Sequence, residues 1–384
     1  ARGERSLLYL LSLAAFLLAL LAKSVVVILP LVLILYDLSF QKRNDVKGLL
    51  LDKLPFVIMA VIFSLVAVES QSVQYLGGKT TWHGGSPYAT LLTMLPVLAT
   101  YLRQVVWPAG LSAFYDVPIR TGIDAQVVGA AVLCLILLTV GVMLYLRRRD
   151  LFFWYALFFA GLIPVSQIVP IVTLMNDRYL YFPMLGGAPF LCAALAAGAE
   201  KVKMPGARRE PAVLALLLLV IGLFAVTSYQ RTEVWQNSAT LWGDAVKKAP
   251  KVALTHDCFG EGLLQQGKLD EAISEFRVAI GLEPAVTAAN LSAAGRYALA
   301  NTHNNLGTAY GIKGMTDAAM GEFFTAIRLN PDLGKAYFNL GNAMMHKGMA
   351  GQALQCFAKA VSLEPDNPAF AANFRMTRDL LTHK

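Results

Sequence analysis

The sequence changes character near Gln230, and this change constrains the fold more than any other feature. Before it, long apolar segments alternate with short basic loops. After it, an aromatic residue stands eight positions before a proline four times over. The aromatic residues are Trp242, Phe276, Phe323 and Phe357, and their prolines are Pro250, Pro284, Pro331 and Pro365. The sequence therefore predicts an all-α fold, in which a polytopic bundle of membrane helices is followed by an α-solenoid of helical repeats.

Composition supports this division. Hydrophobic residues make up 56% of the chain and charged residues only 15%, with a mean hydropathy of +0.54. Soluble domains usually contain about 25% charged residues. The deficit lies in the first part, so we predict a membrane domain over 1–229 and a second domain over 230–384. The net charge of +8 comes from basic loops between apolar segments. This pattern is typical of membrane proteins rather than of nucleic-acid binding. The four cysteines show no metal or disulfide spacing.

The basic loops suggest a topology. The apolar segments are 6–22, 25–38, 55–69, 89–106, 126–146, 151–170, 181–199 and 212–229. A membrane-spanning helix needs about 20 residues, so 25–38 is short and its crossing is left open. The basic loops that begin at Lys42, Arg147 and Lys201 lie on the same side of the membrane only if segment 89–106 does not cross it. We therefore predict about seven spanning helices and an interfacial helix near 89–106.

This topology has consequences for both domains. The loops 70–88, 107–125 and 171–180, and the whole repeat domain, would lie on the extracytoplasmic side. The chain begins at Ala1 without a methionine and enters an apolar segment almost at once. We expect from this that it starts inside a longer protein.

The second domain has a period of 34 residues, seen from Pro331 to Pro365 and from Gly314 to Gly348. A helix–turn–helix unit of this length with Leu-Gly, Ala, an aromatic residue and Pro in phase is the tetratricopeptide pattern. Pro284 and Pro331 are 47 residues apart, so 13 additional residues lie near 285–299. The predicted parts are a half repeat at 231–250, repeats at about 251–284, 300–331 and 334–365, and a C-terminal capping helix.

Asparagines recur on the first helix of these repeats. Asn305 and Asn339 stand two positions before the Gly of Leu-Gly, with Asn304 and Asn342 close by. Stacked amides on a concave face can hydrogen-bond an extended peptide, and solenoids commonly bind partners there. The alternative is that these are solvated polar positions.

One segment of the membrane domain combines charged and aromatic residues. It contains Asp177, Arg178, Tyr179 and Tyr181 at the outer end of two apolar segments. Arginine suits bidentate contact with phosphate, but an Asp–Arg surface pair with interfacial tyrosines explains the segment as well. Lys23, between the first two segments, either extends to the interface or binds an anionic headgroup.

The order of several short motifs resembles one enzyme family. The motifs are Leu21-Ala22-Lys23-Ser24, Tyr36-Asp37, Asp52-Lys53-Leu54-Pro55, Val106-Trp107-Pro108, Phe114-Tyr115, Gly161-Leu162-Ile163-Pro164, Asn176-Asp177-Arg178-Tyr179-Leu180-Tyr181 and Trp235. Together with the repeats, this order is similar to the transmembrane and tetratricopeptide-repeat O-mannosyltransferases and their bacterial relatives. The resemblance covers essentially the whole chain, and the Asp-Arg-Tyr segment and the direct fusion to repeats are its more specific parts.

The resemblance implies a GT-C glycosyltransferase that uses a polyprenyl-phosphate sugar as donor. Arg178, Tyr179 and Tyr181 would bind the donor phosphate, with Lys23 as a further candidate for the same anion. The catalytic carboxylate of this family lies in an outer loop after the first membrane helix, and nothing in this chain matches that loop. Asp177 is the one carboxylate that could replace it. A divalent metal could assist the leaving phosphate, but no metal-ligand set is identified.

These observations predict a protein O-glycosyltransferase of a bacterial inner membrane. It would transfer the sugar to Ser or Thr of a polypeptide bound by the repeats at Asn304, Asn305, Asn339 and Asn342, on the periplasmic side. The alternative is a non-enzymatic membrane scaffold whose repeats recruit envelope or secretion proteins. A transporter is less well supported, because no inverted repeat or pair of broken helices is found.

Overall fold

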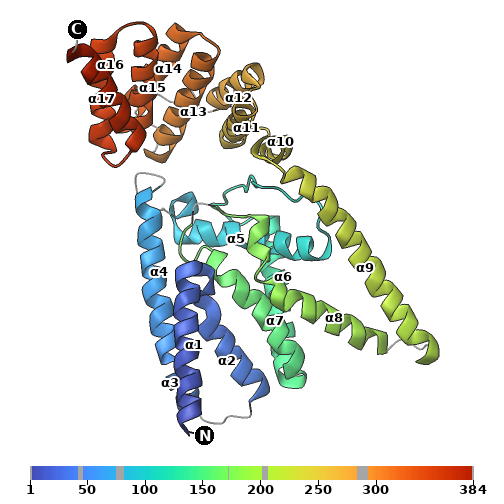
Figure 1. Ribbon diagram of the computed structural model, residues 1–384. Helices are drawn as coiled ribbons and strands as arrows, with labels where there is room; N and C mark the ends of the chain where they lie inside the picture. The colour runs from blue at the N-terminus through green and yellow to red at the C-terminus, as the bar shows by residue number, and fades with distance from the viewer. Residues whose placement is uncertain are drawn as a thin grey trace. The chain divides into compact units, whose positions relative to one another are not determined.

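The computed structural model describes residues 2–41, 46–74, 82–171, 173–200, 206–282 and 293–382. Within these ranges the chain forms helices and turns and no β-strand, which confirms the predicted all-α fold class. The chain divides into two compact units, of which unit 1 ends at Ser228 and unit 2 begins at Tyr229. The division falls inside one long helix, α9 (Gly206–Val234), which Figure 1 shows in yellow-green.

Unit 1 consists of helices joined by short 3₁₀ turns. The helices are α1 (Arg2–Ala22), α2 (Leu29–Phe40), α3 (Val46–Leu51), α4 (Leu54–Gln74), α5 (Pro87–Val106), α6 (Ala125–Arg147), α7 (Arg149–Leu162) and α8 (Met184–Glu200). The 3₁₀ turns are η1 (Ser24–Ile28), η2 (His83–Gly85), η3 (Ile163–Val165) and η4 (Asp177–Leu180). The predicted apolar segment 151–170 is thus two elements, because Pro164 limits α7 and the chain turns at Gln167, which has a positive φ of 63°.

Close backbone contacts and one buried ion pair hold these helices together. A Cβ on Gly161 would lie 2.8 Å from Pro183, and a Cβ on Gly186 would lie 2.5 Å from the backbone of Phe158. These glycines therefore fix α7 against the start of α8 and position η4, which directly precedes α8. At the start of α4, Lys53 pairs at 2.6 Å with Asp37 of α2, whose side chain is only 5% exposed. A charge buried this deeply needs such a partner.

Within the ranges that the structure describes, three helices are long and apolar enough to cross a membrane: Pro87–Val106, Ala125–Arg147 and Pro211–Val234. Shorter apolar helices occur at Leu7–Ala22, Val25–Phe40, Leu54–Val68 and Met184–Gly198. The protein is therefore membrane-associated, while the seven crossings and the sidedness stay predictions. The hydropathy of Pro87–Val106 is 1.3, against 2.8 and 2.5 for the other two. Figure 1 shows α5 lying across the direction of α1 and α4, and its interfacial placement stays a prediction.

Unit 2 is a series of helix pairs. The helices are α10 (Ser238–Lys248), α11 (Ala253–Gln265), α12 (Leu269–Leu282), α13 (Ala293–Ile312), α14 (Thr316–Leu329), α15 (Gly334–His346), α16 (Ala350–Leu363) and α17 (Pro368–Thr382). α13 has 20 residues, whereas its equivalents α11 and α15 have 13 each. Part of the predicted insertion near 285–299 thus extends α13, and residues 285–292 lie outside the described residues.

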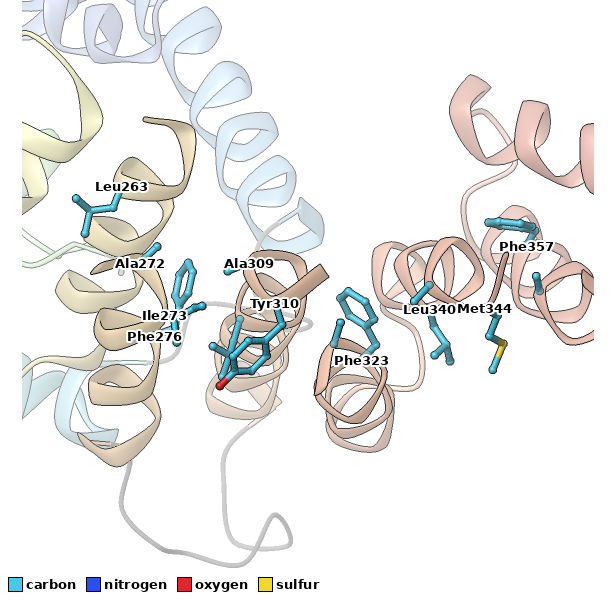
Figure 2. Packing of buried hydrophobic residues seen from close by; sticks show 14 of the residues in the cluster. Leu263, Ala272, Ile273, Phe276, Ala309, Tyr310, Phe323, Leu340, Met344 and Phe357 are labelled. Carbon is cyan, nitrogen blue, oxygen red and sulfur yellow. The ribbon is translucent and has the colours of Figure 1, made fainter. Parts of the chain in front are cut away.

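The contact between a glycine and an aromatic ring explains the 34-residue period. In each pair the first helix places a glycine under a phenylalanine of the second, and a Cβ there would approach the ring to 2.6–2.7 Å. The three pairs are Gly260–Phe276, Gly307–Phe323 and Gly341–Phe357. Figure 2 shows these rings in line through the core, with Leu263, Leu340 and Met344 filling the spaces between helices. Burial of these rings is the main driving force for stacking the pairs.

The turns and the contacts between pairs repeat as well. Gly267, Gly314 and Gly348 have positive φ values of 75°, 81° and 76°, and each stands between the two helices of a pair. Glycine adopts this left-handed conformation without steric cost. Consecutive pairs are also linked by equivalent ion pairs, Lys313–Asp270 and Lys347–Asp317. These side chains are largely exposed, so the ion pairs contribute less than the buried rings.

Substitution of Gly307 by alanine tests the glycine–aromatic contact. The added Cβ would lie 2.7 Å from the Phe323 ring, and we expect a loss of about 1–3 kcal/mol in unfolding free energy. Gly311 of the same helix is the matched control, because a Cβ there meets only Ala319, at 3.8 Å. Gly311→Ala should leave stability unchanged or raise it by up to about 1 kcal/mol. Thermal unfolding followed by circular dichroism measures both, and equal melting of the two variants would contradict the interpretation.

Candidate functional site

The polar segment predicted from the sequence lies at the end of α7, and its backbone is held by side chains. Asn176 caps η4, where its Oδ1 accepts a hydrogen bond from the Arg178 N–H at 3.1 Å. Its Nδ2 donates to the carbonyl of Ala113 at 3.1 Å. The Tyr101 hydroxyl accepts from the Asn176 N–H at 3.1 Å. η4 is therefore fixed both to α5 and to the loop that follows α5.

A second set of contacts converges on the hydroxyl of Tyr115. This oxygen accepts hydrogen bonds from Gln104 Nε2 at 2.7 Å and from the Ser112 N–H at 3.0 Å, and it donates to Asp177 Oδ1. Tyr115 has a single hydroxyl hydrogen, so Gln104 must direct its NH₂ group toward it. Burial, followed by the hydrogen bond to Asp177, raises the pKa of the Tyr115 phenol well above its usual value. The phenol therefore stays protonated at neutral pH.

The structure locates each predicted phosphate-binding residue. Arg178 is exposed, and its guanidinium lies 5.8 Å from the centre of the Tyr179 ring. Among the described residues Arg178 forms no ion pair. Tyr179 is half-buried and Tyr181 is 76% exposed. Lys23 is exposed and directly precedes η1, which contacts η3 at the end of α7.

An apolar cavity reaches the loop that leads to η4. This α2–α4 cavity has a volume of about 490 Å³. Its walls come from η1, α2, α4 and the segment after α7, including Pro30, Leu31, Ser64, Ile163 and Ile171. The backbone carbonyl of Ile171 is 2.9 Å from His83 Nε2, which ties this wall to η2. Such a cavity can hold an apolar chain.

The described residues do not form a metal centre. Within the described part of the chain, no three His, Cys, Asp or Glu side chains come together. Asp177 Oδ1 is engaged by Tyr115. This donor set does not fit a divalent cation, so the function proposed below includes no metal.

The predicted peptide-binding asparagines lie on the first helices of the repeats and bond to polar side chains of neighbouring repeats. Asn339 Nδ2 donates to Asn304 Oδ1 at 2.9 Å, and Asn342 Oδ1 accepts from Asn373 at 2.9 Å. Asn305 Nδ2 donates to Glu261 at 2.8 Å. Asn304 is 5% exposed. These amides therefore link successive repeats, and Asn304 has little surface left for a ligand.

Two cavities open beside this ladder of amides. One, of about 410 Å³, lies between α13 and α15, and the other, of about 370 Å³, lies between α15 and α17. Both are lined by Asn342 and His346, and Asn339 lines the first. We call them together the amide groove. The side chains that line it include no Asp, Glu, Lys or Arg. Of the four predicted asparagines, Asn339 and Asn342 are thus the two that line these cavities.

Sequence reasoning missed several residues of this arrangement. Tyr101, Gln104 and Tyr115 hold η4 from α5 and the following loop, and Gln167 closes the preceding loop by accepting from the Ile171 N–H at 2.9 Å. A glutamine in an apolar helix was the available signal for Gln104. For Tyr115 the sequence offered only its position in a motif, since its partner Asp177 lies 62 residues away.

Comparison with known proteins adds two findings. A family model described as tetratricopeptide repeat matches residues 334–367. The protein O-mannosyl-transferase Tmtc3 of Drosophila melanogaster is 27% identical over 149 residues, which is 38% of this chain and 15% of that protein. The matched stretch is thus a small part of the relative's length. The chain carries a tetratricopeptide repeat and is partly similar to an O-mannosyl-transferase.

Solved structures are similar to part of the chain. The first tetratricopeptide domain of Spaghetti (RPAP3), bound to an HSP90 peptide, is 23% identical and covers 34% of this chain and 93% of that domain, with a TM-score of 0.29. The Arabidopsis OM64 domain is 19% identical and covers 33% and 95%, also with a TM-score of 0.29. MamA is 18% identical and covers 40% and 76%, with a TM-score of 0.32.

Replacement of Tyr115 by phenylalanine tests the brace on η4. The change leaves the Gln104 amide and the Ser112 N–H without their acceptor, which costs about 1–3 kcal/mol for buried groups. We expect faster hydrogen exchange in the loop 107–124 and a lower melting temperature. Tyr88→Phe is the control, because Tyr88 is 54% exposed. Unchanged exchange in Tyr115→Phe would show that the brace does not stabilise the loop.

We expect the carboxyl of Asp257 to make the stability of unit 2 depend on pH. Burial, followed by the charge of Glu261, raises its pKa from 3.8 to about 6. The proton therefore stabilises the folded state below pH 3.8, and this stability is lost as the pH rises through 6. Asp257→Asn should raise the unfolding free energy at pH 7.5 by up to about 3 kcal/mol and have little effect at pH 4. Denaturation at both pH values measures this, with the exposed Asp366→Asn as control; an equal gain at both would contradict the pKa assignment.

Proposed function

We propose that this chain forms the donor-binding body and the acceptor-binding arm of a membrane protein O-glycosyltransferase. The observation that carries the proposal is Arg178, an exposed guanidinium on a backbone held by Asn176, Tyr101 and Tyr115. Similarity to an O-mannosyl-transferase supports it independently. The donor would be a polyprenyl-phosphate sugar, and mannose is the first sugar to test.

In this proposal the acceptor hydroxyl of Ser or Thr forms a bond to the anomeric carbon of the sugar. The bond from that carbon to the phosphate oxygen breaks, and its electron pair stays on the phosphate. Arg178 stabilises the leaving phosphate by charge-assisted hydrogen bonds. A base accepts the hydroxyl proton, and we assign it to no described residue. Asp177 Oδ1 already accepts from Tyr115, which favours a structural role for this carboxylate.

The lipid part of the donor would occupy the α2–α4 cavity. Its apolar lining and its volume of about 490 Å³ suit an isoprenoid chain. The cavity is lined by Ile171, a few residues before η4, so a chain bound there would bring its phosphate toward Arg178. Tyr179 and Tyr181 would flank the phosphate. Lys23, which directly precedes η1 at the edge of this cavity, is the second candidate cation.

The repeats would bind the acceptor polypeptide in the amide groove. Asn339 and Asn342 face the groove, and the charge-free lining favours recognition of peptide backbone over charged side chains. Asn304 and Asn305 would then support the groove rather than contact the peptide. Holding the acceptor on the same chain raises its local concentration beside the donor, and both parts would share the extracytoplasmic side.

Arginine 178 provides the decisive test. The assay uses the full-length protein in nanodiscs, a polyprenyl-phosphate sugar and a panel of polypeptides, and it measures sugar transfer by mass spectrometry. Arg178→Ala should lower the rate at least about a hundredfold, as expected for loss of a group that stabilises transition-state charge. Arg103→Ala is the control with the same charge change, because Arg103 is an exposed residue in the last turn of α5. Full activity of Arg178→Ala would refute the site assignment.

The same experiment distinguishes the scaffold alternative. If the wild-type protein transfers no sugar from any donor but retains polypeptides in a pull-down, a membrane scaffold becomes the better explanation. Asn342→Ala should weaken that retention whichever function holds, since Asn342 lines both parts of the amide groove.

A further inference from the structure

A second apolar groove lies between α6 and α7, and Leu31 and Leu35 of α2 and Leu98 of α5 complete its lining. This α6–α7 groove has a volume of about 670 Å³, within the usual range of ligand sites of about 300–1,000 Å³. It exists because small residues face one another. Gly141 of α6 admits the Tyr155 ring, to which a Cβ would lie 3.1 Å away, and Ala156 and Ala160 leave space on α7. The groove follows α6 from Cys134 to Tyr145.

The length of the groove matches one leaflet of a bilayer. Cys134 and Tyr145 lie eleven positions apart on α6, and Phe152 and Ile163 lie eleven positions apart on the opposite wall. At 1.5 Å per residue this is about 16 Å. Half of a hydrocarbon core is about 15 Å. The groove therefore accommodates the acyl chain of a lipid that belongs to one leaflet.

Positive charge gathers at one end of the groove. Tyr145 and Phe152 form the mouth, with ring centres 5.1 Å apart. The guanidinium of Arg149 lies 5.0 Å from the centre of the Tyr145 ring. The neighbouring Arg148 is paired with Asp150 instead, at 2.9 Å. Arg149 is thus the arginine positioned over the mouth, and the start of α7, whose Arg148 N-cap makes no side-chain cap, adds positive potential there.

We propose that the α6–α7 groove binds an anionic glycerophospholipid, with one acyl chain in the groove and the headgroup phosphate on Arg149. Charge complementarity selects the occupant, since a zwitterionic lipid would gain less from Arg149 than an anionic one. Aromatic residues at the mouth lie at the level where such headgroups meet the hydrocarbon. The headgroup contact comes from Arg149 and not from Arg178, so the proposal does not depend on the proposed glycosyltransferase activity, although Leu31 and Ile163 line both this groove and the α2–α4 cavity.

The test measures lipid retention by the full chain. Purified protein is incubated with phosphatidylglycerol or phosphatidylcholine of identical acyl chains, and bound lipid is counted by native mass spectrometry. Wild type should retain phosphatidylglycerol preferentially. Arg149→Gln should lower this retention about fivefold, whereas Arg149→Lys, which keeps the charge, and Arg148→Gln, whose native side chain pairs with Asp150, should retain it.

A substitution without charge change completes the test. Ala156→Phe fills the groove and should lower retention of both lipids, with circular dichroism and gel filtration confirming that the variant folds. Equal retention of the two lipids by wild type, or an unchanged Arg149→Gln, would overturn the proposal. Polyprenyl phosphate should not displace phosphatidylglycerol. Displacement would assign the groove to the proposed donor instead and would also overturn the proposal.

Discussion

The structure of unit 1 depends on finding a partner for every backbone N–H and C=O group in an apolar chain. Helices satisfy most of these groups internally, which is why long apolar segments become helices. Where helices end, side chains take over. Gln167 bonds the Ile171 N–H and the Thr173 carbonyl, and Asn176 bonds the Arg178 N–H. Each of these side-chain amides thus supplies the hydrogen-bond partner that a helix would supply to the same backbone groups. Arg178 is consequently held on a rigid support although it belongs to no long helix.

Unit 2 finds partners for its backbone groups in the same way in every repeat. Each helix pair satisfies its own backbone and then buries one aromatic ring over one glycine, so a single contact such as Gly307–Phe323 determines the spacing of the two helices. Because each pair contacts mainly its neighbours, the polar residues between them must also match. Asn339 bonds Asn304, and Asn373 bonds Asn342. The amide ladder is therefore first a means of stacking repeats, and Asn339 and Asn342 are the members that also line the amide groove.

Local sequence patterns predicted the helices and the repeats of this structure. They could not predict contacts between segments that are far apart in the sequence. The all-α class and the glycine–aromatic period follow from helical spacing, as Gly341 and Phe357 illustrate. The sequence also singled out Arg178 as a candidate phosphate-binding residue. The residues that support Arg178 could not be predicted in this way, because no periodicity connects Tyr115 to Asp177 or Tyr101 to Asn176. The asparagines were found by their register, but register does not reveal that they bond to each other.

Among the described residues, three arginines lie beside tyrosine rings, and their surroundings give them different roles. Arg277 donates at 2.7 Å to the hydroxyl of buried Tyr310, so its donors are used within the repeat core. Arg149 and Arg178 are exposed and lie over a ring without a recorded hydrogen bond to its hydroxyl. A tyrosine face orients a guanidinium while leaving its N–H donors available. The same pair of residues therefore stabilises the fold when the hydroxyl is within reach, and it leaves the guanidinium donors available, as both proposals require, when only the ring is.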